Sequence, residues 1–224
     1  MRLTQDELKQ QVAHAAVAHI RDQLHTEMIL GIGTGSTVDI FIDQLATHKH
    51  RFKGAVSSSE RTTERLHRQG IRVFDLNEVD SLEWYIDGAD EINEKGEMTK
   101  GGGGALTREK IVASVAKQFL CIVDETKQVK QLGAFPLPIE VVPMAQASVT
   151  RALEALGGRV VQRANFVTDN GGIILDVHGL QINNPLHLEQ HINDIPGVVC
   201  CGLFALHKAT VALIATQKGV ITTS

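Results

Sequence analysis

Apolar residues recur along the chain with two spacings, which predict alternating helices and strands. Near the N-terminus, apolar positions three or four residues apart run from Leu8 to Ile20, and the Thr4-x-x-Glu7 pattern before them is typical of a helix start. Short apolar runs bounded by glycine or charged residues predict strands at 28–32, 53–56, 71–74, 82–86 and 119–123. Helical patterns lie between several of these runs, at 38–45, 60–69 and 107–116. This alternation predicts an α/β fold, with a parallel sheet covered by helices.

The pattern changes after residues 132–138, where two prolines and a glycine interrupt it. The elements predicted next are a strand, a helix, two strands, a helix and a strand, at 139–142, 148–156, 159–163, 173–177, 185–194 and 198–204. This β-α-β-β-α-β order is that of a ferredoxin-like domain. Apolar runs at 211–216 and 220–223 predict a closing hairpin that rejoins the first sheet. We therefore expect one domain at 1–131 plus 205–224, and a smaller one at 132–204 that serves packing or oligomerisation.

Composition and charge narrow the class of protein. The chain has 224 residues, of which 43% are hydrophobic and 21% charged, as is ordinary for a globular protein. Its net charge of −4 offers no basic surface for nucleic acid, and no apolar run approaches the ~18 residues of a membrane span. The polar N-terminus is unlike a signal peptide. The three cysteines are an odd number and two of them, Cys200 and Cys201, are adjacent, which favours a reduced, cytoplasmic protein.

The stretch 98–110 carries the strongest chemical signal. After a predicted hairpin at 92–100, it places Lys100 before four glycines, Gly101 to Gly104, and Glu109 in the first turn of a predicted helix. Glycine N–H groups can approach an anion closely, and a helix start favours negative charge. A cation, N–H donors and a carboxylate together can stabilise an oxyanion while a base moves a proton. A flexible glycine loop beside a charged helix start is the alternative that the sequence leaves open.

Three other polar turns also follow predicted strands, where ligands of parallel sheets bind. The turn Gly31 to Thr37 suits a phosphate or similar anion, although it lacks the lysine of a P-loop and the spacing of a dinucleotide site. A tight turn in which Ser36 only caps the helix is its alternative. The carboxylates of Asp87, Asp90 and Glu91 suit the hydroxyls of a sugar, a solvated turn or a metal ion, but no His or Cys cluster supports a metal. Lys127 suits a phosphate or is a plain surface lysine.

Two histidines and a cysteine are further candidates for chemistry. His187 and His191 have the i, i+4 spacing of helical metal ligands, but Glu189 lies in the wrong place for the H-E-x-x-H pattern. We therefore expect them to be surface histidines. Cys121 lies within an apolar strand, and we expect it to pack in the core rather than act as a nucleophile.

Four stretches in series resemble the type A ribose-5-phosphate isomerase family: GIGTGSTV, SSSERTTERL, DGADEI and KGGGGALTREK. The likeness continues through FPLPIEVVPMA, VTDNGGIILDVHG and IPGVVCCGLFA, so it covers essentially the whole chain. The resemblance implies a Rossmann-like domain with a smaller α/β domain. It implies interconversion of D-ribose 5-phosphate and D-ribulose 5-phosphate through a cis-enediol(ate), in the non-oxidative pentose phosphate pathway. It implies a cytoplasmic homodimer or higher homo-oligomer that uses no cofactor and no metal.

The resemblance also implies roles, position by position. Glu109 matches the proton-transferring base. Asp87 and Asp90 match carboxylates that hold sugar hydroxyls and assist ring opening. Lys100 matches the residue that, with the following glycines, stabilises the enediolate. The other substrate-binding positions are Thr34, Gly35, Ser36, Thr37, Gly88, Ala89, Gly101, Gly102, Gly103 and Lys127, and Lys9 is a further candidate. Gly104 stands where some family members carry alanine.

Other classes of protein would share some of these features. A sugar-phosphate sensor usually adds a DNA-binding module, which the acidic charge does not favour. An amino-sugar-phosphate deaminase would release ammonia, and a coenzyme A transferase would form a glutamyl thioester. A purely structural oligomer subunit would leave the glycine and acidic turns unexplained.

Overall fold

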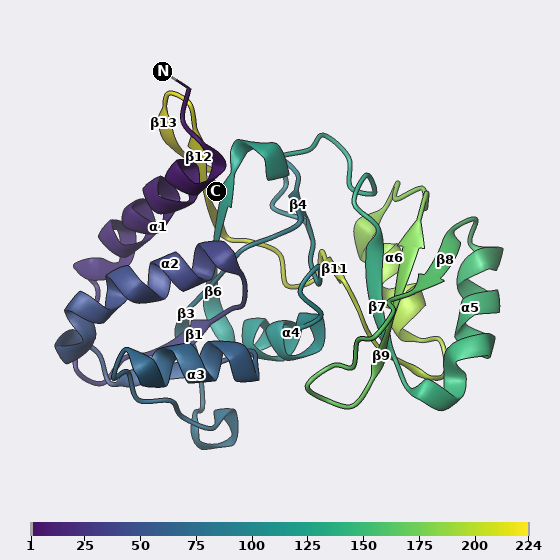
Figure 1. The fold of residues 1–224 in the computed structure, drawn as a ribbon, viewed down its shortest axis with the longest axis horizontal. Helices are drawn as coiled ribbons and strands as arrows, with labels where there is room; N and C mark the ends of the chain where they lie inside the picture. Colours follow the sequence, from purple (N-terminus) through teal and green to yellow (C-terminus); the bar gives the residue numbers. More distant parts are fainter. Residues whose placement is uncertain (1, 224) are drawn as a thin grey trace. The chain divides into compact units, whose positions relative to one another are not determined.

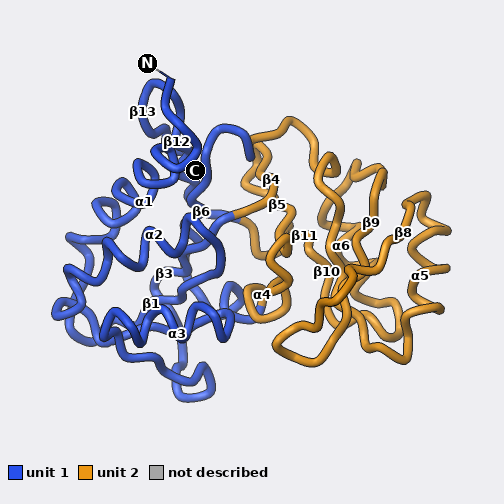
Figure 2. Tube along the Cα trace, in the orientation of Figure 1, with its two compact units in different colours: residues 1–88, 111–127, 209–224 blue, residues 89–110, 128–208 orange. Residues whose placement is uncertain are grey.

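The computed structural model describes residues 2–223, and the chain forms two compact units (Figures 1 and 2). Unit 1 combines residues 1–88, 111–127 and 209–224, and unit 2 combines residues 89–110 and 128–208. The chain therefore passes from one unit to the other four times, at 88/89, 110/111, 127/128 and 208/209. None of the described helices is long and apolar enough to cross a lipid bilayer.

Unit 1 is built around a six-stranded sheet in the order β13-β12-β6-β3-β1-β2. All neighbouring strands are parallel except β12 and β13, which form an antiparallel hairpin. The strands are β1 (Ile29–Ile32), β2 (Gly54–Ser57), β3 (Leu82–Asp87), β6 (Ala116–Asp124), β12 (Val211–Thr216) and β13 (Gly219–Thr223). The helices are α1 (Gln5–Arg21), α2 (Ser36–Leu45) and α3 (Glu60–Arg68). The predicted α/β class is confirmed, and so is the return of the closing hairpin to the first sheet.

The core of unit 1 forms where the apolar face of α1 meets α2 and the sheet. One buried cluster runs from Leu8 through Phe41 to Ala215 and includes residues of all these elements. The predicted start of α1 is also confirmed, since the Thr4 hydroxyl accepts a hydrogen bond from the Glu7 amide and the Glu7 carboxylate accepts one from the Thr4 amide. This reciprocal capping satisfies two N–H groups that the helix itself leaves without partners.

Unit 2 contains a four-stranded antiparallel sheet in the order β10-β7-β9-β8. Its elements follow the predicted β-α-β-β-α-β order: β7 (Leu137–Val141), α5 (Gln146–Ala155), β8 (Arg159–Gln162), β9 (Ile173–His178), α6 (Pro185–Asn193) and β10 (Val198–Cys201). A separate apolar cluster, from Leu132 to Leu203, forms its core. A second small sheet, β11-β5-β4, joins β4 (Glu91–Ile92), β5 (Met98–Thr99) and β11 (Leu203–Phe204). The helix α4 (Leu106–Ser114) begins in unit 2 and ends in unit 1.

Residues 89–110 are grouped differently from the predicted domains, which placed 1–131 together. The hairpin of β4 and β5 is held by later parts of the chain. Strand β5 pairs with β11, and the buried Glu91 carboxylate accepts hydrogen bonds from the amides of Gly133 and Phe135. Because these partners lie far away in sequence, local pattern does not reveal them.

Two predicted strands are wrong in extent. Residues 71–74 form only an isolated bridge, between Val73 and Ala55. The Ala55 amide donates to the Arg72 carbonyl and the Phe74 amide donates to the Ala55 carbonyl, and the pairing with β2 ends there. Residues 198–204 divide at Gly202 into β10 and β11, which lie in different sheets. A Cβ on Gly202 would lie 2.4 Å from the Lys100 carbonyl oxygen, so the close approach of two backbones requires glycine there.

Candidate active site

The predicted site residues divide between the two units. Unit 1 contains Lys9, the turn Thr34 to Thr37, Asp87, Gly88 and Lys127. Unit 2 contains Ala89, Asp90, Lys100 with its glycines, and Glu109.

In unit 1, the predicted anion-binding turn lies at the switch point of the sheet. Strand β1 has β2 on one side and β3 on the other. The chain leaving β1 continues to β2 and the chain leaving β3 continues to β6, so the two connections run in opposite directions from the carboxyl ends of β1 and β3. Ligands of open α/β sheets bind at such points, beyond the carboxyl ends of the strands. The turn Thr34 to Thr37 follows β1, Asp87 ends β3, and Lys127 ends a 3-10 turn that follows the neighbouring β6. Lys9 lies on α1, where its ammonium pairs with Asp6 at 3.6 Å.

Asp87 fixes this turn from a fully buried position. One carboxylate oxygen accepts hydrogen bonds from the amides of Thr34 and Gly88, at 3.0 and 2.7 Å, and the other accepts one from the Tyr85 hydroxyl at 2.5 Å. Gly33 lies directly against the same carboxyl group, since a Cβ there would lie 1.9 Å from its carbon. The close approach explains why this position of the turn holds glycine.

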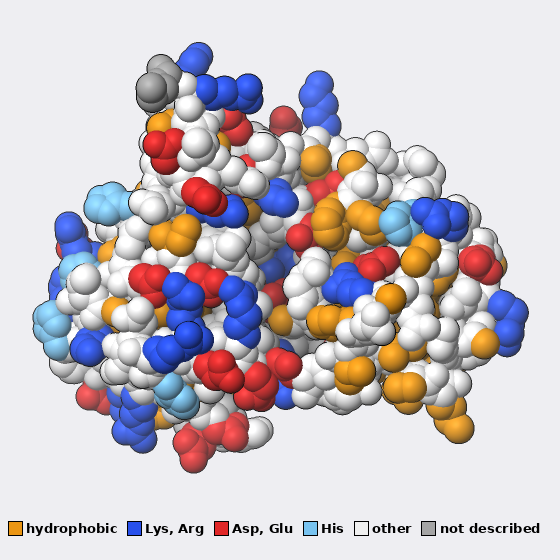
Figure 3. Space-filling model, in the orientation of Figure 1, with side chains coloured by type: hydrophobic (Ala, Val, Ile, Leu, Met, Phe, Trp, Pro, Cys, Tyr) orange, Lys and Arg blue, Asp and Glu red, His pale blue; other side chains and the backbone are white. Residues whose placement is uncertain are grey.

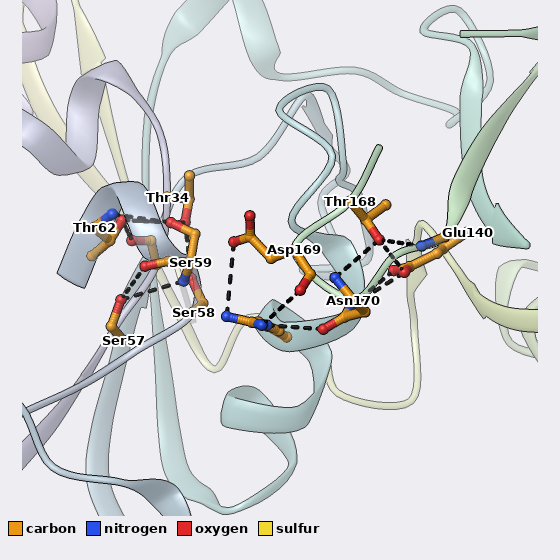
Figure 4. Close-up of polar contacts among 12 residues, drawn as sticks. Thr34, Ser57, Ser58, Ser59, Thr62, Glu140, Thr168, Asp169 and Asn170 are labelled. Carbon is orange, nitrogen blue, oxygen red and sulfur yellow. Dashed lines mark hydrogen bonds and ion pairs between the residues drawn. The ribbon is translucent and has the colours of Figure 1, made fainter. Parts of the chain in front are cut away.

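A cluster of hydroxyl groups supports the other side of the turn, as Figure 4 shows. The Thr34 hydroxyl lies 2.7 Å from the Ser59 hydroxyl, 3.0 Å from that of Ser58 and 3.3 Å from that of Thr62. Thr62 also donates to the Gly33 carbonyl at 2.8 Å, and Ser59 caps α3 by accepting from the Thr62 amide. The serines belong to the stretch SSSERTTERL, but no role in the site was predicted for them. Their position at the carboxyl end of a strand was the available signal for a supporting role.

The helix that follows the turn is left open at its start. Gly35 is the N-cap of α2, with φ of +140°, and no described side chain caps this helix. The alternative in which Ser36 caps the helix is therefore wrong. Helix N–H groups with no side-chain cap attract an anion, because the helix dipole places partial positive charge there.

In unit 2, Lys100 and Glu109 form a buried ion pair. The Lys100 ammonium lies 3.1 Å from a Glu109 carboxylate oxygen, and the two side chains are 3% and 5% exposed. Lys100 directly follows β5 and its amide donates to the Gly202 carbonyl, whereas Glu109 lies in the first turn of α4. The Lys100 ammonium also lies 5.4 Å from the centre of the Phe204 ring, a favourable cation–π distance. The prediction that a cation and a carboxylate lie together here is confirmed.

The glycines between Lys100 and α4 form a tight turn. Gly101 and Gly104 have φ of +104° and +78°, which favour glycine, and the Gly104 amide donates to the Gly101 carbonyl at 2.9 Å. The Gly102 amide donates to the Asp90 carboxylate at 2.7 Å. Asp90 and the glycine turn therefore form one hydrogen-bonded structure.

The first turn of α4 is anchored by a second buried carboxylate, Glu140 on β7, which Figure 4 shows. Glu140 accepts hydrogen bonds from the hydroxyls of Thr107 and Thr168 and from the side-chain NH2 group of Asn170. Arg108 bonds the same loop, at 2.9 Å from the Asn170 side-chain oxygen. Glu140 was not among the predicted site residues because it lies inside an apolar strand, although a glutamate in such a run was itself a signal.

A further buried pair, Lys110 and Glu189, lies beside two cysteines. The Lys110 ammonium lies 2.6 Å from Glu189, whose carboxylate also accepts from the amides of residues 205 and 206. Burial acts to lower the pKa of Lys110, but attraction to the Glu189 carboxylate, and to Cys201 and Cys200 once these thiols ionise, outweighs it and raises that pKa. Burial raises the pKa of the Cys200 thiol, and it raises the pKa of the Cys201 thiol to about 12. Both thiols therefore stay protonated at neutral pH, which does not suit a nucleophile.

Within residues 2–223, no group of three or more His, Cys, Asp or Glu side chains is placed to hold a metal ion. The imidazole rings of His187 and His191 stack on α6 with their centres 6.4 Å apart.

Comparison with known proteins gives consistent matches along the chain. The sequence model described as ribose 5-phosphate isomerase A (phosphoriboisomerase A) matches residues 54–219. Ribose-5-phosphate isomerase A of Bordetella avium (strain 197N) is 59% identical over 218 residues, which cover 97% of each chain. The protein of the same name from Bordetella petrii is also 59% identical, with the same coverage.

Solved structures agree with these matches. A crystal structure of ribose 5 phosphate isomerase A from Neisseria gonorrhoeae superposes with a TM-score of 0.95 at 46% identity, covering 100% of this chain and 98% of the other. A ribose 5-phosphate isomerase from Methanocaldococcus jannaschii gives a TM-score of 0.91 at 38% identity, covering 99% and 100%. A D-ribose-5-phosphate isomerase in complex with phospho-erythronic acid gives 0.92 at 31% identity, also covering 99% and 100%.

Proposed function

The chain belongs to the ribose 5-phosphate isomerase A family, and from that premise we propose how its residues interconvert D-ribose 5-phosphate and D-ribulose 5-phosphate. The activity that the sequence analysis expected is confirmed: the chain is an aldose–ketose isomerase. The reaction moves a proton between adjacent carbons and leaves the composition of the sugar phosphate unchanged. It therefore needs a base, a way to stabilise an oxyanion, and groups that hold the sugar and its phosphate.

Glu109 is the base in this proposal. It takes the proton from C2 of the open-chain aldose, and the electron pair of the broken C–H bond forms the C1–C2 double bond of a cis-enediolate, with the charge on O1. A proton passes from O2 to O1, and Glu109 returns its proton to C1, which leaves a carbonyl at C2. The observation that carries the assignment is the buried contact between Glu109 and Lys100. A positioned base of this kind contributes about 10² to 10⁴-fold to a rate.

Lys100 and the glycine segment Gly101 to Gly103 stabilise the enediolate. A buried ammonium beside backbone N–H groups is an oxyanion-stabilising arrangement, and its effect is strong because little water screens it. The lysine and the glycine amides supply the positive charge that this step requires.

The remaining positions bind the substrate. Asp87 and Asp90 hold sugar hydroxyls and assist ring opening, with Gly88 and Ala89 between them. The open start of α2, with Gly35 as its N-cap, suits the phosphate. We assign the binding turn to Thr34, Gly35, Ser36 and Thr37, and a further phosphate contact to Lys127.

The proposal also includes the assembly and location of the protein. We propose a cytoplasmic homodimer or higher homo-oligomer that acts in the non-oxidative pentose phosphate pathway, with contacts through residues 132–204. Apolar side chains on the surface of unit 2 support this region as the contact (Figure 3). Met144 is 96% exposed, and Val142 and Val199 are about half exposed. Sedimentation of the wild type and of Met144→Glu as equal monomers would contradict this part.

The activity test uses the purified protein, ribose 5-phosphate and a chelator, with ketose formation as the readout. Glu109→Gln is expected to stay folded and to lose nearly all turnover. Glu94→Gln, at an exposed position of unit 2, is the matched control and is expected to keep wild-type rates. Wild-type turnover by Glu109→Gln would remove Glu109 from the mechanism.

A further inference from the structure

One arginine of unit 2, Arg163, holds the backbone of the glycine turn. A single guanidinium nitrogen, Nη1, donates to the carbonyls of Gly101 and Gly102, at 3.2 and 3.1 Å. The other nitrogens donate to the two oxygens of Asp176, Nε at 3.0 Å and Nη2 at 2.6 Å. The Arg163 and Asp176 side chains are only 19% and 18% exposed. Neither residue was among the predicted site residues.

This contact determines where two amides of the turn point. In a trans peptide group the C=O and N–H bonds point in opposite directions, and no cis peptide bond occurs among the described residues. Because the carbonyls of Gly101 and Gly102 both face Arg163, the amides of Gly102 and Gly103 both face away from it. The Gly102 amide shows this directly, since it donates to Asp90 at 2.7 Å. The Gly102 amide therefore points to Asp90, and the Gly103 amide points away from Arg163.

The turn needs an external hold of this kind. Glycines have the widest conformational freedom of any residue, so four in succession do not fix their own peptide planes. Phe166 packs against one end, where a Cβ on Gly104 would lie 2.1 Å from its ring, and Arg163 lies 5.4 Å from the centre of the same ring. Asp176 projects from β9 and orients Arg163, which follows β8. A rigid sheet thus fixes the arginine, and the arginine fixes the turn.

We propose that Arg163, oriented by Asp176, is a positioning residue that presets the glycine turn, so that the Gly103 amide joins Lys100 as a donor to the enediolate oxygen while the Gly102 amide holds Asp90. The inference rests on the proposed function of the glycine turn. Lysine cannot replace this arginine, because one ammonium does not bind a carboxylate with two parallel bonds while also bonding two carbonyls. The effect should fall on the transition state rather than on ground-state binding, because the donors meet a full negative charge only when the enediolate forms.

The test compares Arg163→Lys and Asp176→Asn with the wild type and with Arg159→Lys, a conservative change at an exposed position at the start of β8, the strand that precedes Arg163. We expect kcat to fall about 10²-fold in the first two, the effect of losing an oxyanion donor. KM should change by less than about threefold, and Arg159→Lys should behave as wild type. Phospho-erythronic acid has a carboxylate where the enediolate carries charge, so its inhibition should weaken in parallel with kcat. Inhibition by inorganic phosphate should stay unchanged.

Chemical rescue separates positioning from a general loss of structure. Free guanidinium at tens of millimolar should restore part of the kcat of Arg163→Ala, and should not act on Asp176→Asn. A kcat within twofold of wild type in both Arg163→Lys and Asp176→Asn would overturn the inference, as would a loss confined to KM. If Glu109→Gln is inactive while these variants are fully active, the inference fails and the proposed mechanism stands. An active Glu109→Gln would instead defeat the mechanism itself.

Discussion

Replacing both members of the Lys100–Glu109 pair by apolar residues should cost less stability than replacing either one. The ammonium and carboxylate are 3.1 Å apart, which corresponds to about 5 kcal/mol of attraction at an effective dielectric constant near 20. Both side chains are at most 5% exposed, so a variant that removes one charge keeps the other buried without this partner. Breaking a buried pair typically costs about 3 to 5 kcal/mol, whereas replacing both members by apolar groups is often neutral or stabilising.

The assay is a double-mutant cycle of Lys100→Met, Glu109→Met and the double variant, with urea unfolding followed by circular dichroism. Each single variant should lose about 3 kcal/mol or more of unfolding free energy, and the double variant should recover most of it. Every variant should be inactive, so the stability and the activity respond differently to the second substitution.

An exposed pair provides the control. Lys117 and Glu83 approach to 2.6 Å, but their side chains are 59% and 42% exposed, so their coupling should be at most about 1 kcal/mol. Losses below about 1 kcal/mol in each single variant of the buried pair, adding up in the double variant, would contradict this prediction. The pair would then be solvated, and a water-shielded base would no longer be supported.

Three other predictions concern the anion-binding turn, the cysteines and the start of α1. Gly33→Ala should lower kcat/KM at least about tenfold, because its Cβ would displace the Asp87 carboxylate; unchanged steady-state kinetics would contradict this. The native protein at pH 8 should not react with a disulfide reagent, because all three cysteines are buried. Burial also raises the pKa of the Cys200 thiol, and it raises that of the Cys201 thiol to about 12. Rapid labelling without denaturant would contradict this prediction. The hydrogen bonds from Thr4 lower the pKa of Glu7 in the folded state. The capping box therefore stabilises the fold at pH values above the pKa of Glu7 in the unfolded state, and this stabilisation is lost as the pH falls through the lower pKa of the folded state. The unfolding midpoints of wild type and Glu7→Gln should differ at pH 7 and converge in acid.

Local signals in the sequence predict the elements well, because their causes lie within a few residues. The capping pattern of Thr4 and Glu7 and the spacing of apolar residues from Leu8 to Ile20 determine α1 without distant partners. The arrangement of unit 2 in space is also predictable, since elements in the order β-α-β-β-α-β have few compact arrangements. The contact of Lys100 with Glu109 was predictable for the same reason, since both flank one short turn.

What the sequence did not reveal depends on partners far along the chain. Gly202 breaks a predicted strand because two other backbones approach it, and neither approach leaves a local mark. Arg163 lies about sixty residues from the glycines that it bonds, and Glu140 lies 33 residues from Thr107. Such residues look like ordinary charges on a strand. Their role becomes clear only in the folded structure, where Arg163 bonds the glycine turn and Glu140 bonds the start of α4.

The four passages of the chain between its units set the order in which unit 1 can be completed during translation. Strand β6 pairs with β3 on one side and β12 on the other, yet β12 leaves the ribosome only after all of unit 2 has been made. Until then a nascent chain carries β6, with its apolar run Phe119 to Val123, as an open edge strand. Exposed apolar edges invite pairing with other chains, so a nascent chain at this stage is prone to aggregate. A message truncated before codon 209 would make that state permanent.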